Sequence, residues 1–155
     1  MQEKKYRPNV AIIVLAPSYP FECKVLVAQR SDIKGAWQFP QGGIDDGESP
    51  QEAMFRELEE EIGTNKVEII AQHPAWLEYD FPESVAKKMA PFCGQSQKYF
   101  LVRLKPGAKI DINTPKPEFD DYKFVKIEEL DSLVNHFKKD VYTKVIAHFK
   151  NEGYL

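Results

Sequence analysis

Three glutamates, Glu57, Glu60 and Glu61, lie in one short acidic run and could bind a metal ion if a helix presents them together. At about 100° per residue, the three carboxylates fall on one arc of such a helix. Carboxylates that converge in a partly enclosed site must be protonated or neutralised, and a hard divalent cation is their usual partner. The spacing therefore predicts a site for Mg²⁺ or Mn²⁺.

The sequence specifies both ends of the helix that would carry them, from about Pro50 to Ile62. Ser49 and Glu52 form a capping-box pattern around a proline at the first helical position, and Gly63 supplies the left-handed residue that commonly ends a helix. Two further arcs separate on the same helix. The core arc holds Met54, Phe55, Leu58 and Ile62, and the solvated face holds Glu52, Arg56 and Glu59.

A glutamate-rich helical segment usually forms a solvent-exposed acidic face, and three features argue against that interpretation here. The carboxylates border the core arc, they lack lysine partners four residues further on, and a glycine-rich loop carrying Glu48 precedes the helix. A binding site is therefore the better interpretation of this segment.

Length and composition place these residues in one globular domain, residues 1–155, with 43% hydrophobic and 29% charged residues. The formal net charge is −3, so any nucleic-acid binding must use local basic patches. The apolar run from Val10 to Ala16 is too short for a signal peptide or membrane span, which predicts a cytoplasmic protein without membrane attachment. Cys23 and Cys93 are expected to be reduced thiols. The three histidines lack the spacing of zinc ligands.

Strands flanked by helices predict an α/β layered fold. The expected strands lie near Val10–Leu15, Lys24–Gln29, Val67–Gln72, Lys98–Leu104 and Tyr122–Ile127, and further helices near Ile127–Val134 and Lys138–Lys150. The long connections Pro74–Gln97 and Pro106–Pro117 are candidate substrate loops.

The spacing of Gly42, Glu48 and the run Arg56-Glu57-Leu58-Glu59-Glu60-Glu61-Ile62-Gly63 resembles the Nudix hydrolase signature GX5EX7REUXEEXGU, where U is aliphatic. Thr64 departs from the last aliphatic position. The resemblance implies an α/β/α sandwich with a mixed sheet, and hydrolysis of a nucleoside diphosphate linked to another moiety with divalent metal ions. It implies that Glu57, Glu60 and Glu61 are metal ligands, that Glu57 also orients or deprotonates the attacking water, and that Gly42, Glu48, Arg56 and Gly63 support the helix.

A narrower resemblance to one group in that family, the bacterial RNA pyrophosphohydrolases, covers nearly the whole chain. Members of the group were also described as dinucleoside polyphosphate hydrolases. It implies that the substrate is a 5′-triphosphorylated or diphosphorylated RNA, which leaves as a 5′-monophosphate, a step that promotes mRNA decay. The matching segments are Tyr6–Val10, Trp37–Gly43, Gly94–Lys98, Pro117–Asp120 and Phe137–Tyr142.

Several residues outside the signature have both an ordinary and a functional interpretation. Glu118 could be a surface carboxylate, but the resemblance implies a catalytic or ligand role. Arg7 and Arg30 could be surface cations or could bind phosphate or stack on a base. Phe137 could be core or a base-stacking platform, with Arg30 opposite and Lys138 assisting by resemblance. Gln41 and Lys98 are possible polar contacts, and packing accounts for Trp37, Phe39, Trp76 and Tyr79.

Three functions remain open: a pyrophosphohydrolase of RNA 5′ ends, a hydrolase of free dinucleoside polyphosphates, and a non-catalytic nucleotide-binding module. A complete set of glutamates argues against the third. The first two share every catalytic residue and differ in a groove for further nucleotides. Its candidate cations are Lys87-Lys88, Lys138-Lys139 and Lys144.

Overall fold

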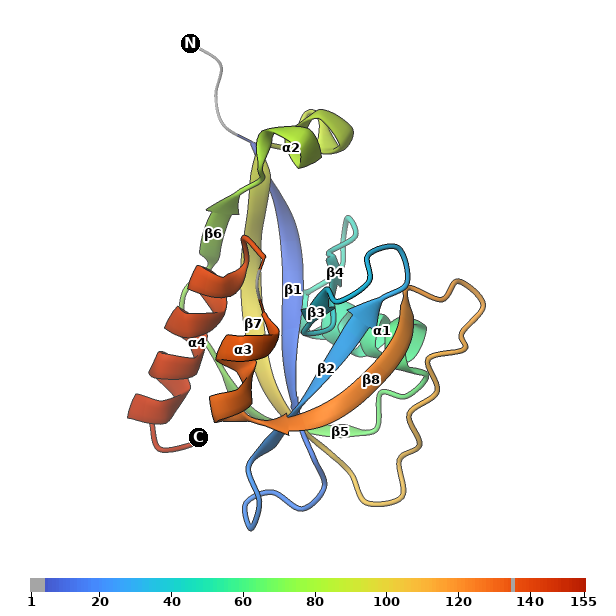
Figure 1. Cartoon of the computed structure of the whole chain (residues 1–155), viewed down its shortest axis with the longest axis vertical. Helices are drawn as coiled ribbons and strands as arrows, with labels where there is room; N and C mark the ends of the chain where they lie inside the picture. Colours follow the sequence, from blue (N-terminus) through green and yellow to red (C-terminus); the bar gives the residue numbers. More distant parts are fainter. Residues whose placement is uncertain (1–4, 135) are drawn as a thin grey trace.

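A mixed eight-stranded sheet forms the centre of the molecule in the computed structural model, which describes residues 5–134 and 136–155 (Figure 1). Strands β1 (Tyr6–Leu15) and β7 (Gly94–Leu104) run parallel in the middle. Strands β5 (Val67–Gln72) and β6 (Leu77–Asp80) pair antiparallel with β7. On the other side, β2 (Lys24–Arg30) pairs antiparallel with β1 and with β8 (Phe119–Lys126).

An opening in this sheet positions the site. β1 pairs with β2 at Leu15 and Val25, and the two strands then diverge along their length (Figure 1). Two short strands line the opening: β4 (Gln41–Gly43) pairs with β1, and β3 (Trp37–Gln38) pairs with β2. The segment between Trp37 and Gly43 therefore crosses from one half of the sheet to the other.

Helices cover the two faces of the sheet, which confirms the predicted α/β layering. Alternate residues of β1 face opposite ways, as strand geometry requires. Val10, Ile12 and Val14 pack with helix α1 (Pro50–Ile62), and Ala11, Ile13 and Leu15 pack with helix α4 (Lys139–Asn151). The start of α1 agrees with the sequence: Ser49 and Glu52 make both bonds of the capping box, and Gly63 adopts φ 74° at the C-terminal cap.

Most predicted elements are confirmed, with shifted ends. Strands β1 and β7 begin earlier than their hydrophobic runs because their first residues are mostly polar or half-buried. Strand β8 begins earlier because exposed Asp120 and Asp121 separate its buried first residue, Phe119, from the rest of the strand. The expected helix over Ile127–Val134 is a 3-10 turn, Ile127–Glu129, followed by α3 (Leu130–Leu133). The interpretation of Pro74–Gln97 as a loop is wrong, since it contains β6 and α2 (Glu83–Met89). The segment Pro106–Pro117 is irregular, as expected.

Two further observations concern the described residues alone. No helix among them is long and apolar enough to cross a membrane. Cys23 and Cys93 are both unpaired and half-buried.

Candidate functional site

Two of the three predicted metal ligands are buried at the opening between β1 and β2. Glu57 and Glu61 point from α1 toward β4, and their exposed fractions are 8% and 3%. The backbone N–H of Gln41 donates to Glu61 Oε2 at 3.2 Å. Glu60 differs, because its side chain is 58% exposed. The carboxylates therefore share one side of the helix, but only Glu57 and Glu61 lie against the sheet.

Gly42 leaves room for the Glu57 carboxylate. A Cβ atom at Gly42 would overlap the carboxylate carbon and both oxygens of Glu57. A Cβ at Gly43 would likewise overlap the guanidinium of Arg7, which lies beside β4. The two glycines thus let a carboxylate and a guanidinium approach the β4 backbone closely, as glycine often does in functional sites.

Arg56 organises the acidic groups, and its predicted place on the solvated face is wrong. Its Nε and Nη2 donate to the two carboxylate oxygens of Glu48 at 2.7 and 2.8 Å, a bidentate pair. Its Nη1 donates to Glu57 at 2.8 Å and to Glu60 at 3.1 Å, and Nη2 also donates to the Gly43 carbonyl at 2.8 Å. The hydrogen bonds from Arg56 lower the pKa of Glu48 to about 2. The hydrogen bonds of Arg56 therefore link the loop that carries Glu48 to the helix.

Burial and mutual repulsion set the charge state of the buried carboxylates. Burial raises the pKa of Glu57 above its ordinary value, against the opposing hydrogen bond from Arg56. Burial raises the pKa of Glu61 further, and the carboxylates of Glu118 and Glu57 add to that rise. Glu118 comes from the irregular segment before β8, and its carbonyl accepts from the N–H of Ser31 at 2.9 Å. Three carboxylates from two separate segments thus repel one another at one place.

This donor set suits a divalent metal ion in kind. All the groups are hard carboxylate oxygens, and burial and mutual repulsion raise the pKa of Glu57 and of Glu61, which a bound divalent cation would counteract. With the side chains as they stand, residues 5–134 and 136–155 contain no group of three or more His, Cys, Asp or Glu side chains arranged to hold one ion. In this arrangement, Arg56 donates hydrogen bonds to one carboxylate oxygen each of Glu57 and Glu60.

The start of α4 brings a cation and an aromatic ring to the same opening. Lys138 is 5% exposed, and its Nζ donates to Gln38 Oε1 at 3.3 Å. Burial, with help from the charge of Arg30, lowers the pKa of Lys138 to about 7, whereas Glu61 and Glu118 raise it. Phe137 is 40% exposed, and the Lys138 amino group lies 5.9 Å from its ring centre. The burial of Lys138 was not predicted from the sequence.

Arg30 lies within electrostatic reach of Lys138 and is bound to Asp32. Its Nε donates to Asp32 Oδ1 at 2.8 Å, and the guanidinium and carboxylate form an ion pair. That hydrogen bond lowers the pKa of Asp32. An exposed ion pair of this kind contributes little stability, so Arg30 can exchange Asp32 for another anion or a base at small cost.

His136 fixes the segment before α4 to β3, and we expect it to make the folded state sensitive to acid. Its Nδ1 accepts from the Lys138 N–H at 3.3 Å, so Nε2 carries the proton and donates to the Trp37 carbonyl at 2.9 Å. Burial lowers the pKa of His136. The unfolded chain therefore binds a proton first, and stability present above about pH 6.5 is lost as the pH falls below it.

The variant His136→Gln should show a weaker pH dependence, because its amide can still donate to Trp37 but does not titrate. Melting temperatures of both proteins, measured from about pH 8 to pH 5, would test this. A single titrating group can change the free energy of unfolding by at most about 1.4 kcal/mol per pH unit. Parallel curves would show that His136 does not carry the effect.

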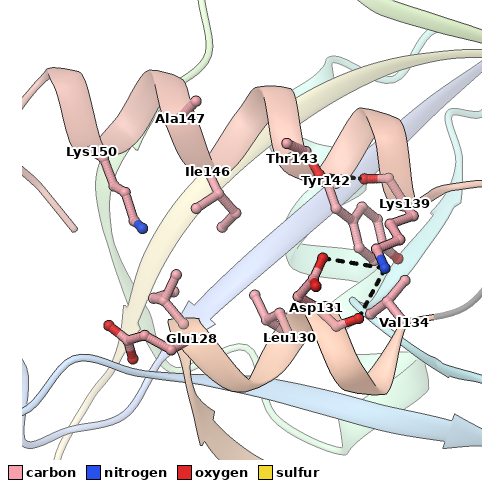
Figure 2. A pocket seen from close by; sticks show the side chains of 11 residues that line it. Glu128, Leu130, Asp131, Val134, Lys139, Tyr142, Thr143, Ile146, Ala147 and Lys150 are labelled. Carbon is pink, nitrogen blue, oxygen red and sulfur yellow. Dashed lines mark hydrogen bonds and ion pairs between the residues drawn. The ribbon is translucent and has the colours of Figure 1, made fainter.

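Lys98 and Lys139 do not join the site. Lys98 faces the α1 side of β7, where its Nζ donates to the His73 carbonyl at 2.7 Å. Lys139 turns away from its neighbour Lys138 into a separate apolar groove of about 320 Å³ between α3 and α4, where its amino group contacts the Asp131 carboxylate at 3.2 Å (Figure 2). Lys138 and Lys139, both named as candidate groove cations, therefore lie in different surroundings.

Residues assigned to packing have mixed positions. Phe39 and Tyr79 are buried, Trp37 is half-buried and Trp76 is exposed, so packing does not explain Trp76. Tyr79 also contacts the Phe137 ring at 5.6 Å between ring centres. This contact and the buried amides of Gln95 and Gln97 were not predicted from the sequence, although polar residues on the core-facing side of β7 were a signal for them.

Comparison with known proteins identifies the relatives of this chain. A family profile described as the NUDIX domain matches residues 5–148. An RNA pyrophosphohydrolase of Campylobacter jejuni subsp. jejuni serotype O:23/36 (strain 81-176) is 63% identical over 153 residues, which cover 99% of this chain and 98% of the relative. An RNA pyrophosphohydrolase of Helicobacter pylori (strain P12) is 57% identical over the full length of both chains.

Solved structures support the same fold. The C. elegans Ap4A hydrolase in a binary complex has a TM-score of 0.70 at 19% identity, covering 94% of this chain and 98% of that chain. The E. coli dihydroneopterin triphosphate pyrophosphohydrolase has a TM-score of 0.69 at 20% identity, covering 87% and 92%. At these identities the similarity concerns the fold alone.

Proposed function

Because the chain belongs to the NUDIX family, we propose that it is a divalent-metal-dependent pyrophosphohydrolase that converts 5′-triphosphorylated or diphosphorylated RNA to 5′-monophosphorylated RNA. It would release pyrophosphate or orthophosphate, act in the cytoplasm and so promote mRNA decay. The match to relatives named RNA pyrophosphohydrolase runs along the whole chain, including the segments outside the glutamate helix.

One observation carries the proposal: a buried cation joins the carboxylates to an aromatic ring. Lys138 lies within electrostatic reach of Glu61 and Glu118, and it is adjacent to the half-exposed ring of Phe137. A 5′ polyphosphate linked to a base needs this combination, because one end of the substrate is highly anionic and the other is a flat ring.

Residue roles follow from this arrangement. Glu57, Glu60 and Glu61, with Glu118, would hold Mg²⁺ or Mn²⁺, and bound metal would neutralise polyphosphate charge and lower the pKa of a water. Glu57 would orient or deprotonate that water. Arg7 and Lys138 would bind phosphate oxygens. Phe137 and Arg30 would hold the first accessible base between them, and Gln41 would act from β4.

A hydrolase of dinucleoside polyphosphates is the alternative. It needs the same carboxylates and the same base platform, and one structural neighbour is named an Ap4A hydrolase. RNA is the better proposal, since the relatives named for RNA are 57% to 63% identical and the dinucleotide hydrolase is 19% identical. A non-catalytic module is disfavoured because every signature carboxylate is present.

The deciding experiment compares kcat/KM for two substrates in the presence of Mg²⁺. One is a short RNA with an unpaired 5′-triphosphate, and the other is diadenosine tetraphosphate. We expect higher efficiency on the RNA, with a 5′-monophosphate end as product. Cleavage of the dinucleotide alone would overturn the RNA assignment and leave the NUDIX chemistry intact.

We expect the variant Phe137→Ala to lose RNA turnover with little loss of stability. Stacking of a base on an aromatic side chain contributes about 1–3 kcal/mol, so kcat/KM should fall by about 5- to 150-fold. Because the ring is 40% exposed, the melting temperature should change little. Phe21→Ala is the matched control, since Phe21 is exposed in the loop between β1 and β2. A large fall in melting temperature for Phe137→Ala would make Phe137 a core residue instead.

A further inference from the structure

Gln97 is the centre of a buried hydrogen-bond network beneath the site. Its exposed fraction is 0%. Its Nε2 donates to Asn9 Oδ1 at 2.9 Å and to Gln41 Oε1 at 3.0 Å, and its Oε1 accepts from the Tyr99 hydroxyl at 2.9 Å. One amide thus joins three strands: β1, β4 and β7.

The strand register explains why these groups meet. Gln97 lies beside Asn9 in the parallel pairing of β7 with β1, and Gln41 pairs with Ala11, two residues further along β1. Their side chains emerge on the same face of the sheet, which is the face that α4 covers further along. The polar groups therefore occupy the end of that face nearest the opening.

The network reaches the carboxylates at one end. The side chain of Gln41 accepts from Gln97, and the backbone N–H of Gln41 donates to Glu61. Any rotation of the Gln41 backbone moves both bonds. Gln97 is therefore connected through Gln41 to Glu61, a predicted metal ligand.

The network reaches the aromatic platform at the other end. Gln95 Oε1 lies 3.4 Å from Gln97 Nε2 and accepts from the Tyr79 hydroxyl at 2.7 Å. Burial raises the pKa of Tyr79, so its hydroxyl remains a donor. The Tyr79 ring in turn contacts Phe137, with ring centres 5.6 Å apart. A continuous set of contacts thus runs from Phe137 to Glu61.

A purely structural role does not account for this arrangement. The same face of β7 continues with Leu101, which fills the core without polar groups. Gln97 Nε2 has two hydrogens and faces three acceptors, and Asn9 Nδ2 has no hydrogen-bond partner among the described residues. Buried polar groups are costly when unsatisfied, so a set of apolar side chains of similar shape in place of the whole network would be the more stable choice if only packing mattered.

We propose that Gln97 is a positioning residue: it tethers Gln41 so that the β4 backbone holds Glu61 in place, and it links that backbone to the tyrosine that supports Phe137. This inference rests on the proposed function. Buried hydrogen bonds hold the side chains that they join in a restricted arrangement, and small displacements in an active site can reduce turnover about 100-fold.

The test is the variant Gln97→Met, which keeps the length of the side chain and removes its hydrogen bonds. On triphosphorylated RNA with Mg²⁺, we expect kcat to fall about 10- to 100-fold with little change in KM. Leu101→Val is the matched control, because it trims a buried side chain on the same face of the same strand without touching the network. It should lower the melting temperature and leave kcat near wild type.

A second variant covers the case in which Gln97→Met does not fold. Gln41→Leu removes the side-chain acceptor and keeps the backbone N–H that donates to Glu61, at a half-exposed position. It should also lower kcat, and combining it with Gln97→Met should cost little more than either change alone. A wild-type kcat in Gln97→Met would overturn the inference, and so would a wild-type kcat in Gln41→Leu if Gln97→Met does not fold. Fully additive effects of the two substitutions on kcat would also overturn it. Failure of the wild-type protein to process the RNA would instead count against the proposed function.

Discussion

Replacing Glu57 with glutamine should reduce kcat by about 100- to 10,000-fold, the range lost when a general base is removed. Glu57 is buried beside β4, and in the proposed mechanism it both holds metal and orients or deprotonates the attacking water. Glutamine has the same shape but cannot accept a proton or supply a full negative charge. The measurement is single-turnover hydrolysis of triphosphorylated RNA at saturating Mg²⁺.

The fold should survive this change. Arg56 can still donate to the amide oxygen at position 57, and it keeps both bonds to Glu48. Burial raises the pKa of Glu57, so the folded protein bears a cost for keeping this group ionised at neutral pH. A neutral amide removes that cost, and the melting temperature without added metal should therefore stay the same or rise.

Glu59→Gln is the matched control for Glu57→Gln. Glu59 lies on the same helix, is exposed, and contacts Asn65 rather than the site. It removes the same charge from the same element, so its turnover should remain close to wild type. Near-wild-type turnover by Glu57→Gln with metal present would remove Glu57 from the catalytic groups.

Local signals predicted the glutamate helix and its ends, because caps and helical period depend on residues close in sequence. Ser49, Glu52 and Gly63 act as expected. Arg56 shows where such reasoning stops. Its position on the helix predicted a solvent-exposed side chain. The side chain instead makes a bidentate bond to Glu48, which depends on how the preceding loop folds back.

Residues whose role depends on distant strands were the hardest to predict. The burial of Lys138 depends on Gln38 of β3, and the network around Gln97 depends on the register of β1 and β7. The short strand β4 was invisible as a strand because two of its residues are glycines, which have low strand preference. Tertiary contacts, rather than propensity, create each of these features.

Gly42→Ala should abolish most turnover through Glu57 rather than through backbone strain. The added Cβ would overlap the Glu57 carboxylate, which is the end of a flexible side chain and can move. Moving it breaks the bond from Arg56 Nη1 and displaces the proposed base. We therefore expect kcat to fall at least about 100-fold, as for loss of the base itself, while overpacking costs about 1–3 kcal/mol of stability.

The pair Gly42→Ala and Glu57→Ala isolates this clash. Alone, each variant should lower kcat. In the double variant the overlapping carboxylate is absent. Adding Gly42→Ala to Glu57→Ala should therefore cost almost no further stability. The effects of the two substitutions on the free energy of unfolding should not add. Denaturant unfolding of the four proteins gives the coupling energy. Additive losses would mean that the alanine disturbs β4 itself, and the requirement for glycine would then belong to the strand rather than to the carboxylate it accommodates.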